Sequence, residues 1–267
     1  MNNLDTLIEN GLVVTENEIG HLNIGIKDGK IAYLGDENLN AEFKINASDL
    51  IVLPGGIDPH VHVDQPSGDD VIMADNFQSA TKSAAAGGNT TILPFAMQIK
   101  GQSLRKCVED YHKKAQGNMY IDTSFHLIIS DPTPQVLGQE LPALSKDGYT
   151  SFKVFMTYDD LVLNDKELIE VFDVAKQLKT LVMVHAEGYD SIKYLSDKFE
   201  KEGKTAPYYH APTRPQIVER EATHRAISHA QIVDIPLMIV HVSGEEALNQ
   251  IRWAKDKGCL LYTSRAH

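Results

Sequence analysis

Cysteine is scarce in this sequence, because among its 267 residues only Cys107 and Cys259 occur, far apart and in unrelated contexts. This argues against a framework of disulfides and is typical of a cytoplasmic protein. The sequence also has no apolar run near the roughly 20 residues that cross a bilayer. Its first residues lack the positive charge and apolar core of a secretory signal. We therefore expect a cytoplasmic protein without a membrane partner.

Basic clusters are absent as well. The formal net charge is −12 and no run of lysine or arginine stands out, which argues against nucleic acid or an anionic membrane surface as a partner. Internal repeats, low-complexity tracts and linkers are also lacking. A chain of this length with 42% hydrophobic residues predicts one large domain, alone or with a small appendage.

The N-terminal part, residues 1–53, is rich in short β patterns. Segments 4–15, 22–27 and 30–34 read as strands, and Asp28-Gly29 between the last two is a strong two-residue hairpin signal. We expect a small antiparallel β unit here.

From Pro54 onward strands and helices alternate. After the strand that leads into His60, strands are expected at 90–95, 119–129, 150–157, 180–185 and 236–241, with a seventh from Cys259. Helices are expected between them, among them 76–86, 103–117, 164–179, 191–203, 215–233 and 245–257. Such alternation predicts a parallel sheet with helical crossovers. The expected fold for 54–267 is therefore α/β, an incomplete (β/α)₈ TIM-type barrel of about six to seven of its eight units.

Two histidines follow a glycine-rich bend after an apolar run. His60 and His62 are separated by one residue, so in an extended backbone they point to the same face while Val61 turns into the packing behind them. Taken alone this pair is weak evidence for a metal site, because paired histidines also occur by chance in loops.

The pattern recurs later in the chain. His185 and His241 each end a short apolar run that reads as a buried parallel strand. A similar run contains Lys153, and a buried lysine is costly unless its charge is removed or paired. In a barrel the carboxyl ends of the strands converge, so these distant residues would share one site.

Five candidate ligands are too many for one tetrahedral catalytic zinc but suit two metal ions. A lysine ammonium cannot ligate, whereas the carbamate formed from Lys153 and carbon dioxide is an anionic group that bridges two cations. Two ions about 3.5–4 Å apart would activate water at neutral pH and polarise a carbonyl oxygen. The residues thus indicate hydrolysis of an acyl bond, with zinc or manganese as alternatives.

Four segments carry a resemblance to a known family. Residues 56–64, 151–158, 184–187 and 240–243, together with most of the chain up to about Gly258, resemble the cyclic amidases of the amidohydrolase superfamily, in particular dihydropyrimidinases and D-hydantoinases. The resemblance implies a metal-dependent barrel (54–267) with a small β-sandwich domain, of which 1–53 would be a part. It also implies two divalent metal ions, Zn²⁺ above all, and a homotetramer for the full-length form.

The resemblance also implies roles for individual residues. His60 and His62 would hold one zinc ion and His185 and His241 the other, with Lys153 as the bridging N6-carboxylysine.

Tyr158 matches the family tyrosine that binds substrate and stabilises the oxyanion, a catalytic role. The implied reaction opens the cyclic amide bond of a small ureide, such as hydantoin or a dihydropyrimidine, to an N-carbamoyl amino acid.

Two alternatives remain open. An allantoinase or dihydroorotase is disfavoured by Asp64, which stands where those enzymes carry asparagine or arginine and would repel an anionic substrate. A non-catalytic hydantoinase-like scaffold is disfavoured by the retained ligand set.

Near its C-terminal end, this sequence departs from the pattern of the family. The family aspartate that ligates a metal and works as general acid/base has no counterpart before His267, and 260–267 do not resemble the family's next segment. We therefore expect an N-terminal fragment, truncated within the barrel, that is inactive by itself.

Overall fold

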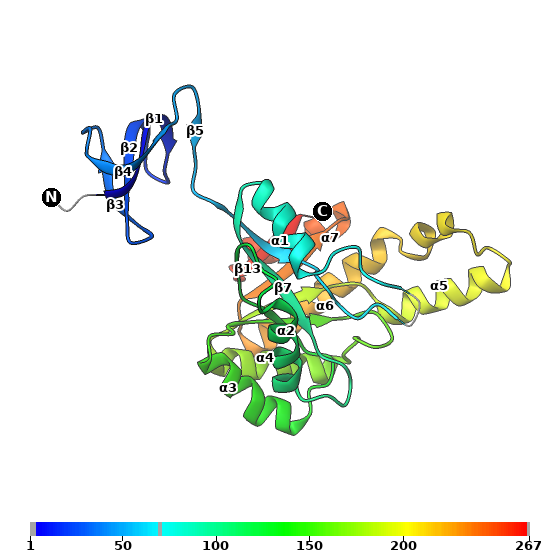
Figure 1. The fold of residues 1–267 in the computed structure, drawn as a ribbon. Coiled ribbons are helices and arrows are strands. Elements are labelled where there is room, and N and C mark those ends of the chain that lie inside the picture. The colour runs from blue at the N-terminus through cyan, green and yellow to red at the C-terminus, as the bar shows by residue number, and fades with distance from the viewer. Residues whose placement is uncertain (1–3, 69–70, 266–267) are drawn as a thin grey trace. The chain divides into compact units, whose positions relative to one another are not determined.

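The structure is a computed structural model that describes residues 4–68 and 71–265. The chain divides into two compact units, Met1–Gly56 and Ile57–His267. Figure 1 shows the small N-terminal sheet and the larger unit of strands and helices.

The N-terminal unit is a five-stranded sheet. Strands β1 (Leu4–Val14), β2 (Ile19–Lys27) and β3 (Lys30–Gly35) pair antiparallel, whereas β4 (Ala41–Asn46) and β5 (Ile51–Val52) both pair parallel to β1. The antiparallel pairing expected for the first three strands is confirmed. The sheet as a whole is mixed, because β4 and β5, which the sequence did not predict, pair parallel to β1. The hairpin is confirmed, since Asp28 and Gly29 have φ of 51° and 71°, as a two-residue turn of type I′ requires.

The second unit is built on a sheet with the strand order β13-β12-β11-β10-β9-β7-β6, in which the short β8 also pairs with β7. The pairs from β7 to β13 are all parallel. The strands are β6 (Gly56–Val61), β7 (Asn89–Met97), β8 (Asp122–Thr123), β9 (His126–Ile128), β10 (Ser151–Phe155), β11 (Leu181–His185), β12 (Leu237–Val242) and β13 (Leu261–Arg265). The predicted α/β class and incomplete barrel are confirmed.

Helices connect these strands. They are α1 (Phe77–Ala86), α2 (Leu104–Ala115), α3 (Leu141–Lys146), α4 (Asp165–Leu178), α5 (Tyr189–Lys201), α6 (Gln216–Val233) and α7 (Glu245–Asp256). Asn76 and Asn164 begin α1 and α4 with capping boxes, which satisfy the first free N–H groups of each helix.

Three details differ from the sequence expectations. The strand expected at 119–129 is two short strands, and α3 follows a π-helical turn at Val136–Glu140. A 3₁₀ helix at Pro207–Thr213 was not expected. It begins at Pro207 and contains Pro212, which has no N–H to donate to a longer helix.

Side chains alternate strictly across the central strands. Phe152 and Val154 of β10 and Val182 and Val184 of β11 belong to the large core cluster that includes the helices. The opposite face forms a second cluster, to which β7, β9, β10, β11 and β12 contribute Phe95, Ile128, Phe155, Met183 and Val240. This second face is the barrel interior, and it carries the candidate site.

Candidate metal centre

The first pair of histidines lies on a phenyl ring. The ring of His60 packs edge-on to Phe95 at 4.7 Å between centroids, and that of His62 stacks on Phe95 at 4.9 Å. The two imidazoles are 5.5 Å apart. Val61, between them, packs against the large core as expected. The i, i+2 spacing therefore presents both imidazoles on one face.

Lys153 lies at the centre of β10 and is completely buried, with 0% of its surface exposed. Its Nζ is 5.0 Å from the centroid of the Phe155 ring and 5.5 Å from that of Phe95. Within the described residues Nζ has no hydrogen-bond partner. Burial lowers the pKa of Lys153 to about 7. A large fraction of this amine is therefore neutral at neutral pH, and the neutral form is the nucleophilic one.

His185 ends β11 and reaches the interior by simple alternation from Met183. Its ring stacks on Phe155 at 5.4 Å between centroids. Its Nε2 lies 2.7 Å from Oε2 of Glu187. Burial lowers the pKa of His185 despite this hydrogen bond, which acts in the opposite direction. The imidazole is therefore neutral at pH 7, as a metal ligand must be.

His241 reaches the same interior in another way. Val240 points inward, so regular alternation would turn His241 outward. The pairing of β12 with β13 is irregular between Ile239 and Val242, and His241 has a φ of 38°. This bulge brings its ring to 4.5 Å from that of His185 and 5.6 Å from that of His60.

The bulge at His241 is supported by its neighbours. The backbone N–H of His241 donates to Ser264 Oγ at 2.8 Å. Burial first, and then the charge of Lys153, keep the pKa of His241 far below its ordinary value. Positive φ at a residue other than glycine is uncommon, and such strain concentrates at functional sites.

Tyr158 lies beside the second pair of histidines. Its ring is 5.2 Å from that of His185, it is 42% exposed, and its φ is 74°. Burial, followed by the charge of Glu187, raises the pKa of Tyr158. The hydroxyl therefore stays protonated at neutral pH and can donate a hydrogen bond.

The residue set fits a metal centre only if the lysine takes part. Within residues 4–68 and 71–265, no three His, Cys, Asp or Glu side chains lie together as a complete metal site. The structure does bring together the five predicted ligands. The rings of His60, His62, His185 and His241 lie beside one another, and those of the first three pack on Phe95 or Phe155, the two rings that the buried amine of Lys153 also contacts. A carbamate on that amine would add the oxygen donors that the histidine pairs lack.

Comparison with known proteins shows the family of this chain. Residues 51–224 match the Amidohydrolase family. The chain belongs to the amidohydrolase family. It is 46% identical to the D-hydantoinase of Ralstonia pickettii over 256 residues, which are 96% of this chain and 56% of that protein. It is 36% identical to the dihydropyrimidinase of Rattus norvegicus, over 96% of this chain and 50% of that one.

Solved structures agree with this assignment. One D-hydantoinase structure matches 98% of this amidohydrolase and 57% of its own chain, with a TM-score of 0.95 and 45% identity. The chain thus spans between 50% and 57% of the length of these relatives. Among the described residues, no helix combines the length and apolarity needed to cross a membrane.

Two cavities in the amidohydrolase open beside the centre. One of about 220 Å³ is lined by His185, Glu187, Arg214 and His241. Another of about 550 Å³ is lined by Tyr158, Met97, Leu161 and Arg214. Arg214 borders both cavities, and its Nε lies 4.0 Å from Glu187 Oε1.

Glu219 is a residue near the site that the sequence did not reveal. Its carboxylate accepts the backbone N–H groups of Ser243 at 2.8 Å and Gly244 at 2.6 Å. These groups lead into α7, so Glu219 of α6 fixes the loop that follows His241. No local pattern marks this contact, because it joins α6 to the segment before α7, which lies 24 and 25 residues further along the chain.

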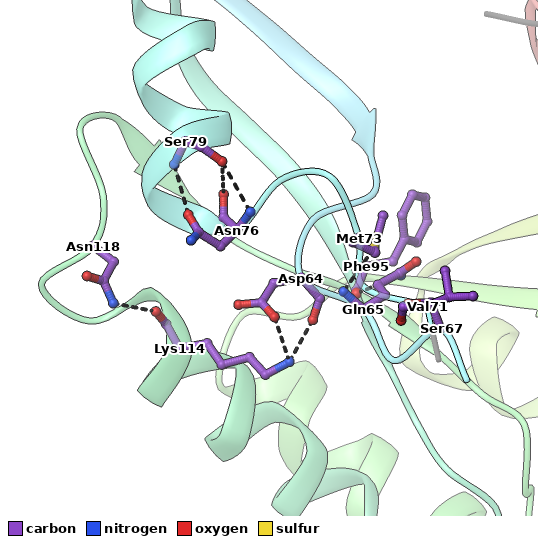
Figure 2. Close-up of polar contacts among 10 residues, drawn as sticks. All are labelled: Asp64, Gln65, Ser67, Val71, Met73, Asn76, Ser79, Phe95, Lys114 and Asn118. Atoms are coloured by element: carbon purple, nitrogen blue, oxygen red, sulfur yellow. Dashed lines mark hydrogen bonds and ion pairs between the residues drawn. The ribbon is translucent and has the colours of Figure 1, made fainter. Parts of the chain in front are cut away.

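Asp64 has a different surrounding from the one the sequence suggested. Lys114 Nζ of α2 donates to Asp64 Oδ1 at 3.2 Å and to its backbone oxygen at 2.6 Å, as Figure 2 shows. The carboxylate is thus paired with a cation. The argument that its charge repels an anionic substrate therefore does not hold in the structure.

Proposed function

We propose that this chain is the metal-binding part of a binuclear hydrolase that opens the cyclic amide bond of hydantoins or dihydropyrimidines to give N-carbamoyl amino acids. The observation that carries the proposal is the fully buried Lys153, whose amine has no hydrogen-bond partner among the described residues. The amine lies 5.5 Å from the centroid of Phe95, on which His60 and His62 pack, and 5.0 Å from that of Phe155, on which His185 stacks. Relatives named D-hydantoinase and dihydropyrimidinase supply the substrate class.

The first step in building the centre is modification of Lys153. The lone pair of the neutral Nζ attacks carbon dioxide, an N–C bond forms, and one proton leaves to give the anionic carbamate. The burial that lowers the pKa of Lys153 to about 7 favours this reaction, because it increases the fraction of the amine that is neutral at pH 7.

The histidines would hold the ions in two pairs, His60 with His62 and His185 with His241, with the carbamate shared between them. Glu187 Oε2 accepts from His185 Nε2, which leaves Nδ1 of that ring as the ligand atom. When bound, the two divalent ions, zinc by preference, would lower the pKa of a water molecule and polarise the scissile carbonyl.

Tyr158 would act on the substrate directly. Its raised pKa keeps the hydroxyl proton in place. The hydroxyl would therefore donate to the substrate carbonyl oxygen as negative charge develops there. Tyr158→Phe should lower kcat by more than it raises KM.

The test is metal analysis together with turnover of hydantoin and dihydrouracil, on a protein that contains this chain in its natural reading frame. We expect two divalent ions per chain and ring opening, both lost in Lys153→Ala and in His60→Ala. A matched control is Lys82→Ala, an exposed lysine of α1 that lies outside the ligand set and outside the lining of both cavities. A protein that binds no metal would contradict the proposal and favour a scaffold, and turnover limited to allantoin or dihydroorotate would point to the other cyclic amidases.

A further inference from the structure

The loop that follows β6 sends one side chain back to a candidate ligand. Oε1 of Gln65 lies 2.8 Å from Nδ1 of His62. Nε2 of the same side chain donates to the backbone oxygen of Phe95 at 3.1 Å, a contact visible in Figure 2. Gln65 therefore connects a residue of the candidate metal centre to the C-terminal part of β7.

The Phe95 carbonyl decides which way the Gln65 amide faces. A carbonyl oxygen can only accept a hydrogen bond, so the group facing it must be the NH₂ of Gln65. The oxygen of Gln65 must then face His62. Because that oxygen can only accept, Nδ1 of His62 must carry the hydrogen, and the lone pair of the neutral ring lies on Nε2.

The backbone of this loop is fixed at the same place. The N–H of Gln65 donates to Met73 Sδ at 3.1 Å, and Lys114 holds the backbone oxygen and the carboxylate of Asp64. Figure 2 shows these contacts on either side of Gln65. The loop backbone therefore keeps the side-chain amide of Gln65 next to the ring of His62.

We propose that Gln65 is a positioning residue, which holds His62 in the tautomer that presents Nε2 to a divalent cation. This inference rests on the proposed metal centre, and it adds a residue outside the ligand set. Partners that fix the tautomer of a ligand histidine typically contribute about 10–100-fold to metal affinity.

The first test compares Zn²⁺ affinity in three versions of the protein, by competition with a chromophoric chelator. Gln65→Met preserves the length of the side chain and removes both hydrogen bonds. Ser67→Ala is the matched control, because it removes a bond in the same loop, from Ser67 Oγ to the Val71 oxygen at 2.7 Å. We expect about 10–100-fold weaker binding of one ion in Gln65→Met, with Ser67→Ala like wild type and equal melting temperatures for all three metal-free proteins.

A second measurement is independent of whether the variant folds. Long-range ¹⁵N–¹H correlation spectra of the metal-free wild type distinguish the two imidazole tautomers, with His62→Gln to assign the signal. The proposal predicts a hydrogen on Nδ1 of His62. A hydrogen on Nε2 would overturn it, as would Gln65→Met with Zn²⁺ affinity within twofold of wild type.

These outcomes separate the inference from the proposed function. If the wild type binds no metal, the centre itself is disproved. If the wild type binds two ions and Gln65→Met binds them equally well, only the role of Gln65 is disproved.

Discussion

Strands β11 and β12 are neighbours in the sheet, and each delivers one histidine to the centre by a different geometry. On β11 the alternation of Leu181, Met183 and His185 is unbroken, so the imidazole faces inward as a consequence of strand pleating. On β12 the alternation fails after Val240, and a bulge with positive φ turns His241 inward. A regular strand turns only every second side chain to the interior, whereas the bulge in β12 lets two consecutive residues, Val240 and His241, face it.

The strongest test of this difference exchanges the last residues of β12. In the double variant Val240→His and His241→Val, the imidazole returns to a regular inward position about 3.3 Å lower along the strand. We expect loss of one of two bound ions at equimolar metal, measured by elemental analysis after desalting. Full binding would mean that the bulge is not required.

A second test addresses β11 through the partner of its histidine. Glu187→Leu removes the acceptor for His185 Nε2. We expect about 10–100-fold weaker binding of one ion by chelator competition. Glu187→Gln keeps an oxygen acceptor and should retain most of the affinity. Equal loss in both variants would point to charge rather than the hydrogen bond.

Lys153 faces both strands, since its charge acts on His185 and His241 alike. Its pKa is about 7 in the folded protein against 10.5 ordinarily. Between these values the unfolded chain binds more protons, so the free energy of unfolding rises with pH, by at most about 1.4 kcal/mol per pH unit. Denaturation of metal-free protein between pH 7 and 9 in buffer without carbon dioxide should show this slope.

The variant Lys153→Met is the control for that slope. It should show a flatter dependence over the same pH range, because the titrating amine is gone. An unchanged slope would assign the pH dependence to other groups.

The smallest expected effect concerns the support of the bulge. Ser264→Ala removes the acceptor for the His241 N–H and should lower the free energy of unfolding by about 1 kcal/mol. Thr263→Ala, next to it on β13, should change stability by less than about 0.5 kcal/mol. Equal changes in urea denaturation would show that Ser264 has no special role at the bulge.

Much of the barrel could be predicted from sequence, because the apolar runs and capping residues are local signals. The directions of His60, His62, Lys153 and His185 follow from alternation alone. The direction of His241 does not, because its bulge depends on a serine from the next strand. The pairing of β4 and β5 with β1 was equally hidden, since no local pattern specifies a parallel partner.

The contact between the His60 and His241 rings has a kinetic consequence. Lys153 and His185 meet across one connection through α4, a short loop closure. His60 and His241 lie near opposite ends of the second unit's sequence. The contact between their rings therefore closes a far longer loop and costs more chain entropy. In the proposed centre the two histidine pairs would share the carbamate of Lys153, so both ions together would be held only once β6 and β12 have curled toward each other. Uptake of the second ion during refolding would then time the last step of barrel assembly.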